Sequence, residues 1–149
     1  MNYDIEKILE EWNKDSKINS NRLDQSLIDI VLLHTKYLDM LTRTKLKLKK
    51  QESDYKQLEA KKWLWYNGKM TKQEIDNLGW GHDPMKGLKV MKSDMDNFYR
   101  LDQDLVNEKL KIDYTRTVLE TLDEIMTSLR WRHSHIKNII DWRRFEAGG

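Results

Sequence analysis

Lysine and aromatic side chains alternate over residues 61–72, which read Lys-Lys-Trp-Leu-Trp-Tyr-Asn-Gly-Lys-Met-Thr-Lys and contain no acidic residue. Ammonium groups neutralise phosphates and aromatic rings stack on unpaired bases, so this mixture is typical of surfaces that bind single-stranded nucleic acid. The same residues can also be interpreted as a hydrophobic cap on the tip of a helical hairpin, with lysines for solubility. For a DNA-binding surface, the predicted contacts are Lys61, Lys62, Trp63, Trp65, Tyr66, Lys69 and Lys72.

A second basic and aromatic cluster lies near the C-terminus, in Arg130–Arg132 and Trp142–Phe145. This cluster is more apolar, because Ile136 and Ile140 share its helical stripe. Subunit packing is therefore favoured over nucleic-acid binding here. The predicted oligomerisation residues are Ile136, Ile139, Ile140, Trp142 and Phe145.

The sequence shows no catalytic or metal-binding constellation. It has no cysteine and no Gly-x-x-x-x-Gly-Lys-Ser/Thr run to cradle phosphates. His133 and His135 are two positions apart and point to roughly opposite faces of a helix, so they cannot chelate one ion. His34 is interpreted as a buried or interface residue, and His82 has only Asp83 beside it. We therefore predict a protein that is not an enzyme and that uses no metal and no cofactor.

Nothing in the sequence predicts secretion or membrane insertion. No apolar run approaches the roughly eighteen residues of a membrane-spanning helix, and the first residues lack the basic and apolar regions of a leader peptide. The absence of cysteine suits a reducing cytoplasm.

The elements that must position these clusters are predicted to be helices. The chain has one proline and six glycines, too few for the many turns of an all-β fold. Apolar residues recur in steps of three and four over two long stretches, which is typical of coiled-coil-like helices. We predict one all-α domain over residues 1–149, a long antiparallel helical hairpin. Its expected elements are a short helix at 4–14, long helices at 22–66 and 92–145, and a loop or tip at 67–91 containing a short helix at 72–78.

Charge is arranged in blocks, although the net charge is only +2. Residues 36–62 carry nine basic and four acidic residues, whereas residues 93–124 carry four basic and nine acidic residues. A chain that folds back around residues 67–90 brings these blocks face to face, where they can pair within a hairpin. Such pairing does not account for the basic residues at 61–92 and 130–144, which have few acidic neighbours in sequence.

The two long helices carry more apolar residues than one stripe each can bury. A two-helix hairpin has nothing to cover a second apolar face. The sequence therefore predicts self-association into a homo-oligomer through both ends of the hairpin. The residues outside the stripes include Ile28, Val31, Leu32, Leu33 and Leu38 on the first long helix, and Val118, Ile125, Trp131, Ile139 and Trp142 on the second.

Three segments together resemble a known family. The C-terminus, His135 to Gly148, reads His-Ile-Lys-Asn-Ile-Ile-Asp-Trp-Arg-Arg-Phe-Glu-Ala-Gly; Leu58 to Lys69 ends in Tyr-Asn-Gly-Lys; and Asp4 to Trp12 opens the chain. In order, spacing and chain length these segments are similar to the UvsY family of recombination mediators of T-even-type tailed phages. The resemblance spans nearly the whole chain.

The resemblance implies a function. UvsY-like proteins are homo-oligomers, rings of six or seven subunits, that bind single-stranded DNA. They help to load the RecA-like recombinase UvsX where the phage single-strand-binding protein already sits, in recombination, replication and repair. The resemblance further implies a location in the cytoplasm of the infected bacterial host.

The resemblance also places the binding surfaces on this chain. The family's DNA contacts correspond to Lys61 and Lys62, although Glu59 stands at the first basic position of the family's Leu-Lys-Ala-Arg run. The family's oligomerisation helix corresponds to Ile136–Phe145. The alternative from a different class is a structural coiled-coil or chaperone-like oligomer whose basic and aromatic tip binds a protein partner.

Overall fold

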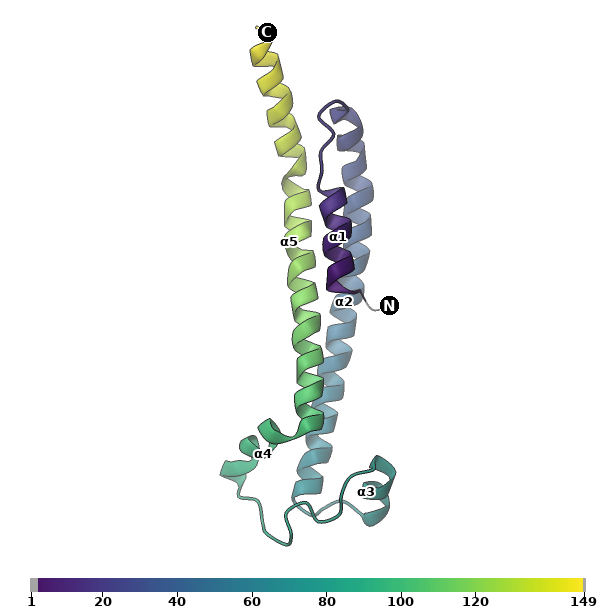
Figure 1. Ribbon diagram of the computed structural model, residues 1–149, viewed down its shortest axis with the longest axis vertical. Helices are drawn as coiled ribbons and strands as arrows, with labels where there is room; N and C mark the ends of the chain where they lie inside the picture. Colours follow the sequence, from purple (N-terminus) through teal and green to yellow (C-terminus); the bar gives the residue numbers. More distant parts are fainter. Residues whose placement is uncertain (1–2, 149) are drawn as a thin grey trace. The chain divides into compact units, whose positions relative to one another are not determined.

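The structure, a computed structural model, describes residues 3–148, which form five α-helices, one short 3-10 helix and no β-strand (Figure 1). The predicted all-α class and its two long helices are confirmed. None of the helices in the described residues is long and apolar enough to cross a membrane. The elements are α1 (Ile5–Asp15), α2 (Leu23–Tyr66), α3 (Lys72–Leu78), η1 (Lys92–Asp94), α4 (Met95–Leu101) and α5 (Gln103–Glu146).

Local capping sets the limits of the short helices. The Asp4 carboxylate accepts a hydrogen bond of 2.9 Å from the Glu6 amide at the start of α1. At α3, Thr71 and Glu74 form a reciprocal capping box, and Gly79 ends the helix in the left-handed conformation with a φ of 69°. These interactions satisfy backbone groups that a short helix would otherwise leave without partners.

The second long helix begins later than the sequence predicts. The stretch expected to be one helix over 92–145 is divided into η1, α4 and α5, with an extended residue at Asp102. The Asp102 carboxylate accepts a hydrogen bond of 3.1 Å from the Leu105 amide, as an N-cap does. Asp102 therefore ends α4 and starts α5, since a capping aspartate competes with the continuing helix for backbone hydrogen bonds.

The described residues divide into two compact units. The first unit contains residues 3–47 and 115–148, and the second contains Leu48–Tyr114. Helices α2 and α5 run through both units.

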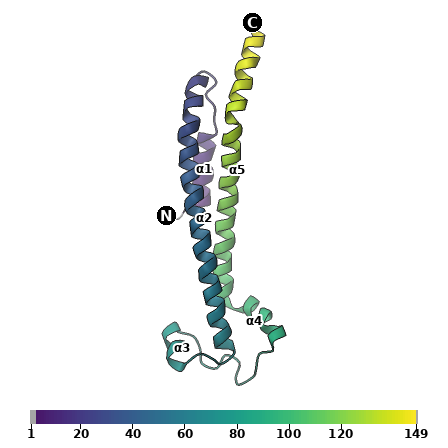
Figure 2. The same cartoon turned by 180° about the vertical axis from the view of Figure 1, so that it is seen from behind.

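The core of the first unit is built by three helices rather than two. Ile8 of α1, Tyr37 and Leu41 of α2, and Leu122 and Met126 of α5 are buried in one cluster. Figures 1 and 2 show α1 beside both long helices of this unit. The Trp12 ring packs edge-on against the Tyr37 ring, with centroids 5.5 Å apart. The short N-terminal helix is therefore part of the core.

Helix α1 covers part of the second apolar face that the sequence left without a partner. Val118 and Ile125 are buried in the same cluster as Ile8, and Leu33 packs against that cluster. The expectation that a bare hairpin exposes these residues is therefore wrong, because the third helix lies over them. Other off-stripe residues stay exposed, among them Val31 (68%), Leu32 (67%) and Trp131 (60%).

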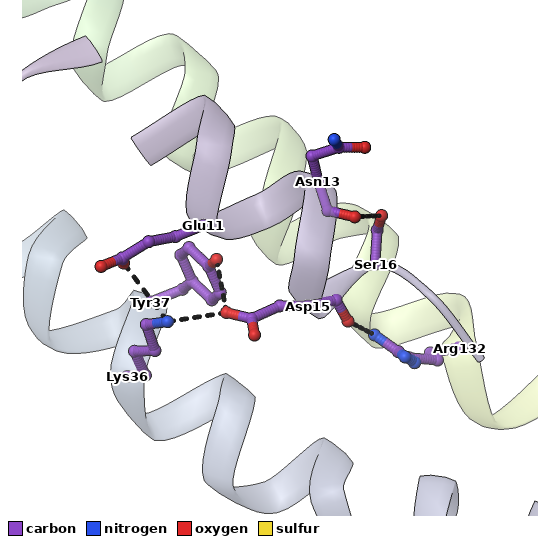
Figure 3. Close-up of polar contacts among 7 residues, drawn as sticks. All are labelled: Glu11, Asn13, Asp15, Ser16, Lys36, Tyr37 and Arg132. Atoms are coloured by element: carbon purple, nitrogen blue, oxygen red, sulfur yellow. Dashed lines mark hydrogen bonds and ion pairs between the residues drawn. The ribbon is translucent and has the colours of Figure 1, made fainter. Parts of the chain in front are cut away.

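A polar network fixes the end of α1 to both long helices (Figure 3). The Asp15 carboxylate accepts hydrogen bonds from Lys36 Nζ at 2.7 Å and from Tyr37 Oη at 2.8 Å. The buried guanidinium of Arg132 donates to the backbone carbonyls of Asp15 at 2.6 Å and Lys17 at 2.9 Å. A cation at the C-terminal end of a helix interacts favourably with the helix dipole and satisfies carbonyls that lack partners within the helix. Arg132 thereby joins α5 to α1.

The second unit is organised around the end of α2. In Figures 1 and 2, α3 and α4 lie on opposite sides of this end. Its buried apolar residues are few, namely Ile75 of α3, Met95 of α4, and Leu105 and Ile112 of α5. Charged and aromatic side chains therefore contribute much of the packing in this unit, and they include the basic and aromatic cluster.

Candidate nucleic-acid interface

The basic and aromatic cluster of residues 61–72 is divided between the interior and the surface of the second unit. We call Lys62, Trp65 and Tyr66 the inner cluster and Lys61, Trp63, Lys69 and Lys72 the outer cluster. The sequence predicted all seven as DNA contacts and did not distinguish the two groups. On a helix, residues 62 and 66 share a face that residues 61 and 63 do not.

Lys62 is an interior residue, with only 3% of its surface exposed. Its Nζ lies 2.7 Å from Asp104 Oδ2 and 3.2 Å from Asp102 Oδ2. The same ammonium lies 4.0 Å from the centroid of the Trp80 ring and 4.6 Å from that of Trp65. Two carboxylates and two aromatic faces thus surround the charge, and they replace the water that an exposed lysine would keep.

Asp102 binds two members of the inner cluster. Its Oδ2 accepts a hydrogen bond of 2.7 Å from Tyr66 Oη in addition to the contact with Lys62. Burial raises the pKa of the Asp102 carboxyl. Hydrogen bonds from Tyr66, the Leu105 amide and Lys62 together lower this pKa by more than burial raises it, so it lies below its usual value. Burial and the neighbouring Asp102 charge raise the pKa of Tyr66. Asp102 is therefore the anion and Tyr66 the neutral donor of this pair.

The aromatic rings of the inner cluster are held by their polar atoms. The Trp65 indole donates a hydrogen bond of 2.8 Å to the Gly81 carbonyl. Its ring packs against those of Tyr66 and Trp80, with centroid distances of 4.8 Å and 5.2 Å. Because both the indole N–H and the Tyr66 hydroxyl are bound, these rings have one fixed orientation.

The outer cluster is exposed. Lys61, Lys69 and Lys72 are all exposed, and Trp63 keeps 39% of its surface accessible. The Lys69 ammonium lies 4.8 Å from the centroid of the Trp63 ring. An accessible indole beside a cation combines the two groups that bind bases and phosphates.

The acidic side chains of residues 63–92 are engaged within the described part of the chain, whereas the exposed Asp94 and Asp96 that follow are not. The three between residues 63 and 92 are Glu74, in the α3 capping box; Asp76, 2.7 Å from His82; and Asp83, which accepts from the Gly87 amide at 2.9 Å. The exposed lysines of this segment have no such partner: within residues 3–148, none of Lys61, Lys69, Lys72, Lys86, Lys89 and Lys92 forms an ion pair. Residues 61–92 carry six exposed lysines against three acidic side chains, so the tip presents an excess of positive charge.

The five predicted oligomerisation residues have different environments in the first unit. Ile136 is fully buried within the chain, and Ile139 and Ile140 are half-buried. Trp142 and Phe145 are 60% and 71% exposed, and their rings stack with centroids 5.6 Å apart. The last turns of α5 extend past the start of α2 (Figures 1 and 2), so no other helix of this unit covers these two rings.

The contacts predicted from the sequence did not include Asp102, Asp104 or Trp80, which surround Lys62. Two signals were available for finding them. Lys62 belongs to the three-and-four stripe of its helix, and the acidic block at residues 93–124 faces that stripe in a hairpin. The described residues contain no group of three histidine, cysteine or acidic side chains that could hold a metal ion.

Known proteins share both the sequence pattern and the fold. Residues 11–149 match the sequence profile of the family described as "Recombination, repair and ssDNA binding protein UvsY". The recombination protein uvsY of Enterobacteria phage T4 is 26% identical over 144 residues, which cover 97% of this chain and 98% of that protein.

Crystal structures of the bacteriophage T4 recombination mediator protein UvsY have the same fold. The lattice type II structure has a TM-score of 0.84 at 24% identity and covers 98% of this chain and 99% of that chain. The lattice type I structure has a TM-score of 0.81 at 24% identity and covers 94% of this chain and 98% of that chain.

Proposed function

Because the chain belongs to the UvsY family of recombination, repair and single-stranded DNA-binding proteins, we propose that a single strand lies across the outer cluster. Lys61, Lys69 and Lys72 bind phosphates, and the accessible ring of Trp63 stacks on a base. The main support is the charge of residues 61–92, where six exposed lysines outnumber three acidic side chains that are engaged within the chain.

The inner cluster has a different role in this proposal. Lys62, Trp65 and Tyr66 act as positioning residues for the end of α2 and bind no phosphate of the strand. Their contacts with Asp102, Asp104 and Gly81 set the direction in which the last turn of α2 presents Lys61 and Trp63. A lysine held by two carboxylates would have to leave both before it could bind a phosphate. Exchanging two anionic partners for one phosphate contributes little binding free energy.

The chain acts as a homo-oligomer in this proposal, a ring of six or seven subunits joined through α5. Trp142 and Phe145 are the anchors, and Ile139 and Ile140 widen the contact. Large rings left exposed at the end of a helix favour association with another copy. Ile136 stabilises the subunit from within and is left out of this interface.

The oligomer then serves as a recombination mediator. Several tips hold one strand, and later contacts form at a high effective concentration. On such a strand the protein helps a RecA-like recombinase to displace the phage single-strand-binding protein, in the cytoplasm of the infected host. The family's role in recombination and repair supports this assignment.

A salt titration of binding to a short oligothymidylate tests the assignment of the outer cluster. Three phosphate contacts per tip predict a slope near −2 in a plot of log affinity against log salt, at ~0.7 per phosphate. Doubling the salt concentration then weakens binding roughly fourfold. Lys61→Ala should make the slope shallower by about 0.7, whereas the exposed Lys17→Ala in the first unit should leave it unchanged.

Two results would contradict the proposal. Equal slopes for the wild type and Lys61→Ala would place the strand elsewhere. Absence of binding at low salt would favour the alternative, a helical oligomer whose tip binds a protein.

A further inference from the structure

A groove in the second unit adjoins the outer cluster and has no assigned role. It lies between the end of α2 and the loop of residues 83–90 and has a volume of about 430 Å³. That volume falls within the range of small-molecule sites, roughly 300–1,000 Å³. Its walls include the Trp65 and Tyr66 side chains, the apolar side chains of Leu88 and Val90, and Lys69 and Lys89.

The groove is formed by fixed groups. Trp65 and Tyr66 are each held by a hydrogen bond to their own chain, at 2.8 Å and 2.7 Å. The facing loop is closed by the bond of 2.9 Å from the Gly87 amide to Asp83 Oδ1. Asp83 and Lys86 both adopt left-handed backbone conformations, each with a φ of 51°. Such conformations are costly for residues with side chains and are often found where a loop serves a site.

The chemistry of the groove suits a flat apolar group that is attached to an anion. Aromatic and aliphatic walls favour a planar ring, and the two lysines have no carboxylate partner within the described residues. The single acidic residue of the lining, Asp83, already accepts the Gly87 amide. Lys69 belongs to both the groove and the outer cluster, so a strand that lies across the outer cluster passes the mouth of the groove.

We propose that the groove holds one unstacked base of the bound strand, with its flanking phosphates at Lys69 and Lys89. This inference rests on the proposed function and adds to it a second base site besides Trp63. A rigid, preformed site loses little further freedom on binding, which favours capture of a base that has left its stack. Base capture by fixed walls depends on the presence of the base and little on its identity.

The test compares two strands with the same number of phosphates. One is a twelve-residue oligothymidylate, and the other is a twelve-residue strand of abasic sugars. The full-length protein should bind the thymidine strand at least about fivefold more tightly, since stacking contributes on the order of 1–3 kcal/mol per base. Leu88→Ala removes apolar wall without changing charge and should weaken binding of the thymidine strand by about fivefold, with little change for the abasic strand.

Met91→Ala is the matched control. Met91 and Leu88 are 67% and 73% exposed in the same loop, but only Leu88 lines the groove. Met91→Ala should therefore leave binding of both strands unchanged. A loss for Leu88→Ala that is equal on the two strands would mean that the loop acts on phosphates or on folding, and it would overturn the base site.

Photocrosslinking locates the base directly. A strand carrying 5-iododeoxyuridine should crosslink at Trp65 or Tyr66, assigned to the single residue by fragment-ion mass spectrometry, besides any crosslink at Trp63. Crosslinks at Trp63 alone, together with unchanged binding by Leu88→Ala, would overturn the groove as a base site and leave the proposed function standing. Failure of both strands to bind at low salt would overturn the proposed function as well.

Discussion

Replacement of the two adjacent lysines, one at a time, separates the outer cluster from the inner cluster. Methionine keeps most of the aliphatic length of lysine and removes the charge. Lys61→Met changes an exposed side chain, whereas Lys62→Met removes an ammonium that is 3% exposed and lies between Asp102, Asp104 and two indole rings.

The structure predicts opposite effects on stability and binding. Lys62→Met leaves the buried Asp102 carboxylate without its cation, and breaking a buried pair costs about 3–5 kcal/mol. The cost should lie near 3 kcal/mol, because Asp102 keeps its hydrogen bonds from Tyr66 and the Leu105 amide. Lys61→Met should change stability by no more than about 0.5 kcal/mol. It should, however, lower affinity for a single strand about fivefold at 0.1 M salt, the effect of one lost phosphate contact.

Two measurements on the same samples distinguish these effects. Denaturant unfolding at one fixed protein concentration gives the stability difference, because oligomers gain apparent stability with concentration. Salt titration of DNA binding, carried out well below the unfolding temperature, gives the slope, which should become shallower by about 0.7 for Lys61→Met and stay unchanged for Lys62→Met. In Lys62→Met, the second change Asp102→Asn removes the unpaired charge and should restore at least half of the lost stability.

One pattern of results would refute this reasoning. Lys62→Met could prove as stable as Lys61→Met and also show a salt slope shallower by about 0.7, the value for one phosphate contact. Lys62 would then have to leave its carboxylates to bind DNA. The division of the cluster would then be wrong.

Three further predictions concern the first unit. Replacement of both Trp142 and Phe145 by Ala should reduce the mass seen by analytical ultracentrifugation and weaken binding to long strands far more than to short ones, because multivalent contacts are lost; an unchanged mass would contradict the proposed interface. Arg132→Met should destabilise the protein by about 3 kcal/mol in thermal or denaturant unfolding, since two carbonyls at the end of α1 lose a charged donor. Burial and the hydrogen bond to Asp15 raise the pKa of Tyr37, so its contribution to stability is complete below the ordinary tyrosine pKa near 10 and is lost as the pH rises above it. Unfolding followed by circular dichroism between pH 8 and about 11 should therefore show a smaller loss of stability for Tyr37→Phe than for the wild type. Equal losses of stability in the two proteins would count against the environment assigned to Tyr37.

The helical class and the place of the basic and aromatic tip could be read from the sequence because their signals are local. Apolar residues in steps of three and four, with glycine and proline concentrated at residues 67–90, leave few choices besides two long helices. Residues 61–72 were marked in the same way, by residue type alone. Thr71 and Glu74 are close in sequence, so their capping box also follows from a short motif.

Only the tertiary structure decided which of these residues face solvent. Lys61 and Lys62 are neighbours of the same type, but Lys62 meets Asp104, 42 positions away in the sequence. Arg132 likewise meets the Asp15 carbonyl at a separation of 117 positions. Whether a charged side chain is buried depends on partners from other elements, and a local sequence pattern does not identify those partners. The packing of α1 over Val118 and Ile125 could not be predicted for the same reason. The sequence of a short amphipathic helix does not indicate where on a long hairpin its apolar face will pack.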